Sequence, residues 1–126
     1  MTWNRPLYYN RLGQPLGSLP YEDEPDQQRA RTLAYAQEWG KDRTVGATQV
    51  GCRWVSTVFL VIDHAVWPGS PPLLFETMVF LTQGDSDGEF DQRYHNEAEA
   101  IMGHCAVVAA LRTRYELPPA RKELTT

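Results

Sequence analysis

The chain has 126 residues, of which 42% are hydrophobic and 22% charged, and its formal net charge is −4. This length and composition predict a single globular domain over residues 1–126, with a core large enough to fold without disulfide or metal cross-links. The acidic balance without a clustered basic run argues against nucleic-acid binding, and the lack of a ~20-residue apolar stretch argues against membrane insertion.

The N-terminal region, residues 1–25, is expected to contain a short strand, a turn and a linker. In "LYYNRLGQPLG", Gly13 suits a tight turn, while Pro15 cannot donate to a strand ladder and therefore favours a sheet edge. The next segment, "DQQRARTLAYAQEW", is rich in helix formers and is followed by Gly40, a typical helix stop. The sequence therefore predicts a helix over 26–39.

Three later segments have the character of β-strands. Residues 44–63 are rich in β-branched side chains, which favour strands over helices. A loop with three prolines and a glycine follows, and then "LLFETMVFLT" predicts a second long strand. After a turn-rich stretch, "EFDQRY" over 89–94 predicts a third. These segments indicate an antiparallel sheet of three or four strands.

The pairing of the two long strands decides which side chains share a face. If Ile62 faces Leu73, Glu76 lies opposite Phe59. In that register one face of the sheet would carry, beside Glu76, the apolar residues Val55, Phe59, Val61, Met78 and Phe80. The other face would be the more apolar one and would receive the last helix.

The C-terminal part of the chain predicts a long amphipathic helix over 96–115. Asn96 and Glu99 have the spacing of an N-terminal cap, in which a side chain accepts from the first helical amides. The apolar stripe comprises Ile101, His104, Val108, Leu111 and Tyr115. Residues 116–126 follow a double proline and are expected to form a flexible tail. The predicted fold is α+β, with this helix packed on one face of the sheet.

Four residues are candidates for chemistry: Asp63, His64, Glu76 and His104. Together they would suit a small metal-assisted or acid/base hydrolase. Each also has a structural interpretation. Glu76 would pair with an arginine or lie opposite Thr57, His104 would bond a strand carbonyl, and Asp63 would initiate a turn. No metal-ligand spacing or phosphate-binding glycine loop accompanies them, so no cofactor is expected.

The aromatic residues favour a different class of function, protein binding. Tyr8, Tyr9 and Trp67 are expected to be at least partly exposed, and exposed aromatic side chains often anchor interfaces. Cys52 and Cys105 belong to no metal-binding motif and are expected to be buried free thiols of a cytosolic protein. The first residues also lack the pattern of a signal peptide.

Several short elements together carry a resemblance. They are Val55-Ser56-Thr57-Val58, Asp63-His64, the run from Pro71 to Phe80, Arg93-Tyr94 and Gly103-His104, preceded by "YYNRLGQPL". In this order they resemble a family of small proteins of unknown activity encoded by bacteriophages and prophages, chiefly of actinobacteria. Members often have Gly-Leu-Asp-His where this chain has Val61-Ile62-Asp63-His64, which implies a less conformationally demanding segment here. They usually have Ser-Thr where this chain has His95-Asn96, and capping chemistry is retained.

The resemblance implies a viral accessory protein that acts in the host cytoplasm. Such a protein would bind a host or phage protein, and inhibition of a host defence or housekeeping factor is one possibility. We also expect a homodimer, because the face around Phe59 would leave more apolar surface exposed than monomers usually show. Glu76 would then lie at the margin of that interface.

Overall fold

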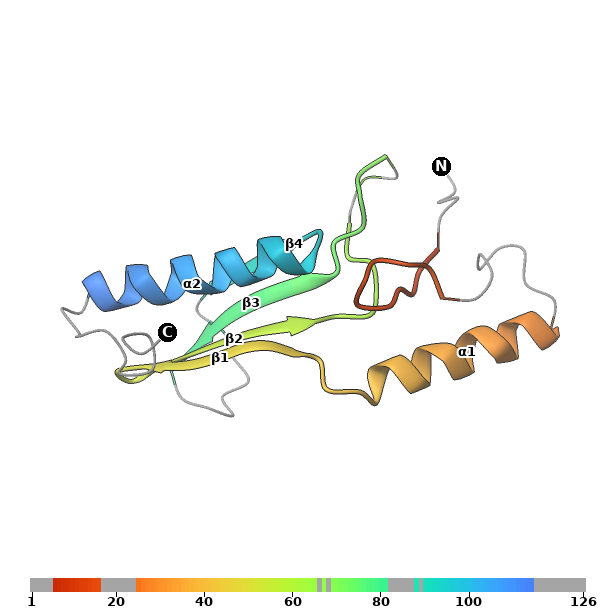
Figure 1. The fold of residues 1–126 in the computed structure, drawn as a ribbon, viewed down its shortest axis with the longest axis horizontal. Helices are drawn as coiled ribbons and strands as arrows, with labels where there is room; N and C mark the ends of the chain where they lie inside the picture. Colours follow the sequence, from red (N-terminus) through yellow and green to blue (C-terminus); the bar gives the residue numbers. More distant parts are fainter. Residues whose placement is uncertain are drawn as a thin grey trace.

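The computed structural model describes residues 6–16, 25–65, 67, 69–81, 88 and 90–114. These residues form two helices and one antiparallel sheet with strand order β1-β2-β3-β4 (Figure 1). The elements are α1 (Pro25–Trp39), β1 (Thr44–Val50), β2 (Arg53–Phe59), β3 (Phe75–Phe80), β4 (Phe90–Tyr94) and α2 (Glu97–Arg114). The predicted α+β fold, with the C-terminal helix on one face of the sheet, is confirmed.

The β-rich segment predicted over 44–63 is a hairpin followed by a loop. β1 and β2 are joined by a two-residue turn whose first residue, Gly51, has a φ of 59°. Two-residue hairpin turns require a positive φ at this position because it matches the twist of the flanking strands, and glycine adopts it without strain. The turn divides the predicted segment in two, so the sheet has four strands.

The predicted register between the two long strands was wrong by one residue. β2 pairs with β3 so that Phe59 lies opposite Phe75 and Val58 lies opposite Glu76. Because side chains alternate between faces, this shift moves every residue of β3 to the other face relative to β2. Both strands are apolar on both faces, so their sequences fit either register.

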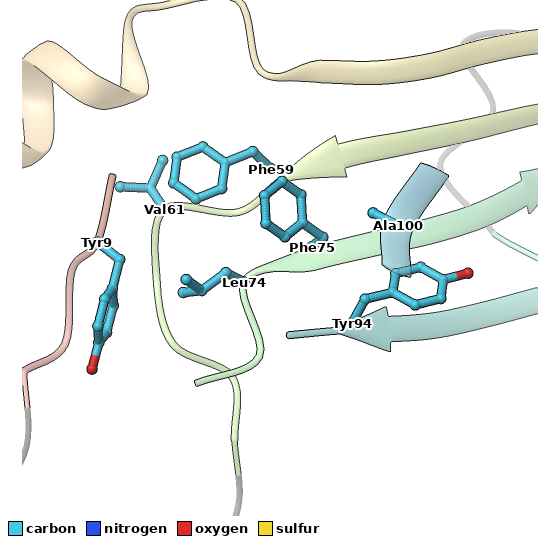
Figure 2. Close-up of a cluster of buried hydrophobic side chains, with 7 residues drawn as sticks. All are labelled: Tyr9, Phe59, Val61, Leu74, Phe75, Tyr94 and Ala100. Carbon is cyan, nitrogen blue, oxygen red and sulfur yellow. The ribbon is translucent and has the colours of Figure 1, made fainter. Parts of the chain in front are cut away.

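One face of the sheet is buried beneath α2. Side chains from β2 and β3 alternate into this face, as Phe59 and Phe75 do in the cluster shown in Figure 2. The buried residues of α2 are Ala100, His104, Val108 and Leu111. Ile101, which was placed in the apolar stripe, is 48% exposed, and Ala100 occupies the core position instead. Tyr115 lies outside the described residues.

The start of α2 confirms the predicted cap. The Asn96 Oδ1 atom accepts a hydrogen bond from the Glu99 amide at 2.9 Å. In return the Glu99 carboxylate accepts from the His95 amide at 3.0 Å, one residue earlier than in the usual capping box. The first bond satisfies a backbone donor that the first turn of a helix leaves unpaired, and the second holds the short connection from β4 into α2.

The first helix, α1, was expected to cover part of the second face of the sheet. It does not cover that face. It lies beyond the end of the sheet, beside the N-terminal segment (Figure 1). The Tyr35 ring packs on Tyr8 with centroids 4.3 Å apart, and the Arg43 guanidinium lies 3.6 Å from the centroid of the Trp39 ring. The face opposite α2 is therefore left without a helix among the described residues.

The N-terminal segment is attached to the loop after β2 by single bridges rather than by a full strand. Tyr8 pairs with Ile62, and Tyr9 pairs with Pro15 across the predicted turn, where Gly13 has a φ of 85°. Most of the expected linker over 18–25 and the whole expected tail over 116–126 lie outside the described residues.

The fold makes a prediction at Gly103, in the second turn of α2. A Cβ atom added there would overlap the Tyr94 ring. Helix propensity alone would make Gly103→Ala stabilising by about 1 kcal/mol. We expect instead that overpacking lowers the free energy of unfolding by about 1–3 kcal/mol, measured by urea denaturation. The matched change Ala106→Gly, at an exposed position of α2, should cost only about 1 kcal/mol. A stabilised Gly103→Ala protein would contradict the close packing of α2 on Tyr94.

Candidate functional site

A chain of buried hydrogen bonds runs between the sheet and α2 and includes His104. The Nδ1 atom of His104 lies 2.8 Å from the Thr57 hydroxyl on β2, and its Nε2 atom lies 2.8 Å from the Thr48 hydroxyl on β1. The Thr57 hydroxyl is also 2.5 Å from that of Thr77 on β3, which accepts from the Tyr94 hydroxyl at 3.1 Å. One helix residue is thus joined to all four strands.

Most of this network lies in the interior, and its Thr48 end borders a groove between β1 and α2. Thr57 and Thr77 are completely buried, and His104 is 8% exposed. Burial lowers the pKa of His104, which favours the neutral imidazole. Its ring also lies close to Gly46, where an added Cβ would be 2.9 Å away. The predicted bond from His104 to a strand carbonyl was wrong, since its partners are threonine hydroxyls.

The chemistry open to this network is limited by its own contacts. Both nitrogens of His104 are engaged: Nδ1 bonds the buried Thr57 hydroxyl, which also bonds Thr77, and Nε2 bonds the partly buried Thr48 hydroxyl. A general base needs a nitrogen within reach of a substrate proton. The geometry therefore supports a structural role, in which the network fixes how α2 sits on the sheet.

Glu76 lies on the opposite face of the sheet. Its Oε2 atom is 3.0 Å from the Nε atom of Arg93 on β4, and its side chain is 12% exposed. Burial raises the pKa of Glu76, and the neighbouring Asp91 raises it further, while Arg93 acts in the other direction. The structural interpretation of Glu76 as the partner of an arginine is confirmed. Its cross-strand neighbour on β2 is Val58 rather than Thr57 or Phe59.

Asp63 and His64 shape the loop that follows β2. The Asp63 Oδ1 atom accepts from the Ala65 amide at 2.8 Å and from the Leu73 amide at 3.1 Å. The Nδ1 atom of His64 lies 2.9 Å from the Ile62 carbonyl oxygen. The carboxylate therefore holds together the two ends of the proline-rich loop, as the turn interpretation proposed.

The segment before Asp63 is conformationally demanding, contrary to the expectation drawn from its valine. Val61 has a φ of 69°, in the left-handed region that β-branched residues rarely enter. The side chain is completely buried in the core, and the Val61 carbonyl accepts from the Tyr9 amide at 2.8 Å. Core packing and this bond hold a backbone conformation that glycine would adopt more easily.

The four residues proposed for a hydrolase do not form one site. Glu76 and His104 lie on opposite faces of the sheet, and Asp63 and His64 bond backbone groups of the loop. Within the ranges that the structure describes, no three His, Cys, Asp or Glu side chains gather where they could hold a metal ion.

The residues proposed for binding fall into two groups. Trp67 is 73% exposed, as expected, and Tyr8 is partly buried under α1. Tyr9 and Phe59, in contrast, are 5% and 1% exposed and belong to the core (Figure 2), so their assignment to a surface was wrong. Val55 and Val61 are also fully buried, because the corrected register turns Val55 toward α2.

The two cysteines are free, as predicted, but both are exposed rather than buried. Cys52 occupies the second position of the β1–β2 turn, and Cys105 is an exposed residue of α2 directly after His104. The prediction of burial failed because Cys52 was placed inside a continuous strand and Cys105 beside the core stripe of the helix.

The sequence-based prediction found only part of the open face of the sheet: it placed Glu76, Met78 and Phe80 there, but not Trp54, Val58 or Arg93. This face carries four large apolar side chains, each partly exposed, around the ion pair of Glu76 and Arg93; they are Trp54, Val58, Met78 and Phe80. The alternation of side chains shows which residues of one strand share a face. It does not show which faces of neighbouring strands lie on the same side of the sheet, because that depends on the register. We call these six residues the open-face patch.

The chain matches no protein-family model, no curated protein and no solved structure. In the part of the chain that the structure describes, neither helix is long and apolar enough to cross a membrane. The assignment of function therefore depends on the geometry.

The buried imidazole predicts a pH-dependent stability. The folded-state pKa of His104 lies below its ordinary value of 6.5, so the unfolded chain binds this proton first as the pH falls. The contribution of His104 to stability should be complete above pH 6.5 and decrease as the pH falls below it. Thermal denaturation between neutral and mildly acidic pH measures this slope. His104→Gln should flatten it, and Cys105→Ser, at the next position, should keep it. Equal slopes in all three proteins would contradict a buried neutral His104.

Proposed function

We propose that this chain is a bacteriophage accessory protein that binds a host or phage protein in the host cytoplasm, and that the open-face patch is its contact surface. The resemblance to phage-encoded proteins supports the viral origin and the cellular location. The observation that carries the binding function is a sheet face that neither described helix covers, although it bears large apolar side chains.

The patch has the composition of an interface centre. Trp54 lies opposite Phe80 across β2 and β3, and Val58 lies opposite Glu76. Aromatic residues, methionine and arginine are enriched at protein interfaces, and a few of them usually supply most of the binding energy. Cross-strand packing already holds these side chains in place, so little conformational entropy is lost when a partner binds.

The charges of the patch restrict the chemistry of the partner. Glu76 and Asp91 both lie beside Arg93, and Glu76 is already largely desolvated. A partner that covers this face would remove the remaining water, which is costly unless each charge keeps a bonded neighbour. A suitable partner surface is mainly apolar, with hydrogen-bond donors positioned for the Asp91 carboxylate.

A role as a modulator of a host factor follows from binding alone. A small domain that covers a working surface of a host protein can block that surface without chemistry of its own. No observation favours the hydrolase, because its four residues do not converge.

A matched pair of substitutions tests the proposal. Met78→Lys places a charge in the open-face patch, whereas Met102→Lys makes the same change at a residue that is 72% exposed on α2. With tagged protein as bait in host lysate, we expect mass spectrometry to identify a partner whose capture falls about tenfold or more with Met78→Lys. The Met102→Lys bait should capture it as the wild type does. Equal capture by both variants, or none by the wild type, would overturn the proposal.

A further inference from the structure

The two edges of the sheet differ in how they are protected against pairing with another strand. β4, with the sequence "FDQRY", carries Asp91 and Arg93, and charged side chains discourage the addition of a further strand. β1, with the sequence "TVGATQV", has seven residues and contains no charge and no proline. Stable monomers usually block such an edge. Among the described residues, β1 is therefore the less protected edge, apart from the irregularity in its pairing between Thr44 and Gly46.

The backbone of β1 offers hydrogen-bonding groups on its outer side. Val50 pairs with Arg53 next to the tight turn, and Thr48 pairs with Val55. In an antiparallel ladder the residues between such bonded pairs direct their amide and carbonyl away from the neighbouring strand. Those residues are Ala47 and Gln49, and both are exposed. At the other end of the strand, the Arg11 guanidinium donates to the Thr44 carbonyl at 3.2 Å and covers that part of the edge.

A groove lies between β1 and α2 on the covered side of the sheet. It has a volume of about 380 Å³ and is lined by Thr48, His104, Cys105, Val108, Ala109 and Arg112. None of these six side chains is a carboxylate, and β1 next to the groove has no large side chain between Gly46 and Thr48. A second strand could therefore approach β1 closely, with its side chains directed into the groove.

We propose that two copies of this chain form a two-fold homodimer by antiparallel pairing of their β1 strands. The pairing that uses both outward-directed residues places Ala47 of one copy opposite Gln49 of the other, with the two-fold axis at Thr48. The two sheets then become one continuous eight-stranded sheet. Thr48 lies on the axis at the end of the hydrogen-bond network, so His104 positions a residue of the interface.

Two observations favour a second copy over a foreign strand. The two-fold makes the α2 helices antiparallel, so the acidic first turn of each, with Glu97 and Glu99, faces the basic last turn of the other, with Arg112 and Arg114. In addition, each copy carries the same less protected edge, so the chain itself is always present as a matching strand.

This inference is independent of the proposed function. The pairing uses the edge of the sheet and leaves the open-face patch of both copies accessible. It keeps the expected homodimer but moves its interface away from Phe59, which is buried.

The mass of the particle in solution, measured by light scattering at micromolar concentration, tests the pairing. The wild type should have twice the 14.4 kDa mass of one chain. Ala47→Pro removes only the outward-directed amide of this residue. Edge strands tolerate proline at such a position, so this variant should be a folded monomer. Ala47→Lys should also give a monomer, whereas Gln92→Lys, on the protected edge, should remain a dimer. A monomeric wild type, or a dimer that survives both Ala47 changes, would overturn the proposal.

Amide hydrogen exchange gives a test without substitutions. In the dimer the amides of Ala47 and Gln49 are bonded to the second copy, so they should be protected and should lose protection on dilution to monomer. Fast exchange at both amides in the concentrated protein would contradict the pairing. Neither measurement involves the binding partner, so the dimer and the proposed function can fail separately.

Discussion

The position of α2 on the sheet depends on a buried polar contact, the bond between His104 and Thr57. A buried imidazole and buried hydroxyls are costly unless each is bonded, so only one placement of the helix satisfies them together. Apolar packing alone would allow α2 to slide or rotate, since Val108 and Leu111 can pack against several neighbours. The network therefore selects one arrangement, and Gly46 and Gly103 leave the space for the rings that this arrangement needs.

Several residues that the sequence singles out meet in this arrangement. Thr57, Tyr94 and His104 belong to the network, while Gly103 lets α2 approach Tyr94. Asp63 holds the ends of the loop, and Glu76 pairs with Arg93. Each of these residues has a structural role, although the residue types alone would suggest a catalytic one. These contacts thus account for the fold rather than for a reaction, and the proposed binding function rests on the face of the sheet that the described helices leave uncovered.

The sequence alone predicts the elements well and their combination less well. The helices, the cap at Asn96 and the turn at Gly13 follow from local propensity, which a chain expresses without tertiary contacts. The register of β2 and β3 does not, because both strands are apolar on both faces and either pairing buries a similar surface. That single shift explains why Phe59 was assigned to the surface. The network of His104 also depends on tertiary proximity, since its three threonines come from three strands.

In the part of the chain that the structure describes, the sheet has one face covered by α2 and one face that no helix covers. Thiol labelling of adjacent residues of β3 tests this arrangement most directly, in a protein whose two exposed cysteines, Cys52 and Cys105, are replaced by serine. A cysteine introduced at Met78 should react quickly, because it lies on the open face. A cysteine introduced at Val79, which is 3% exposed, should react slowly and only through opening of the fold. Faster labelling at position 79 than at position 78 would reverse the two faces and contradict the account.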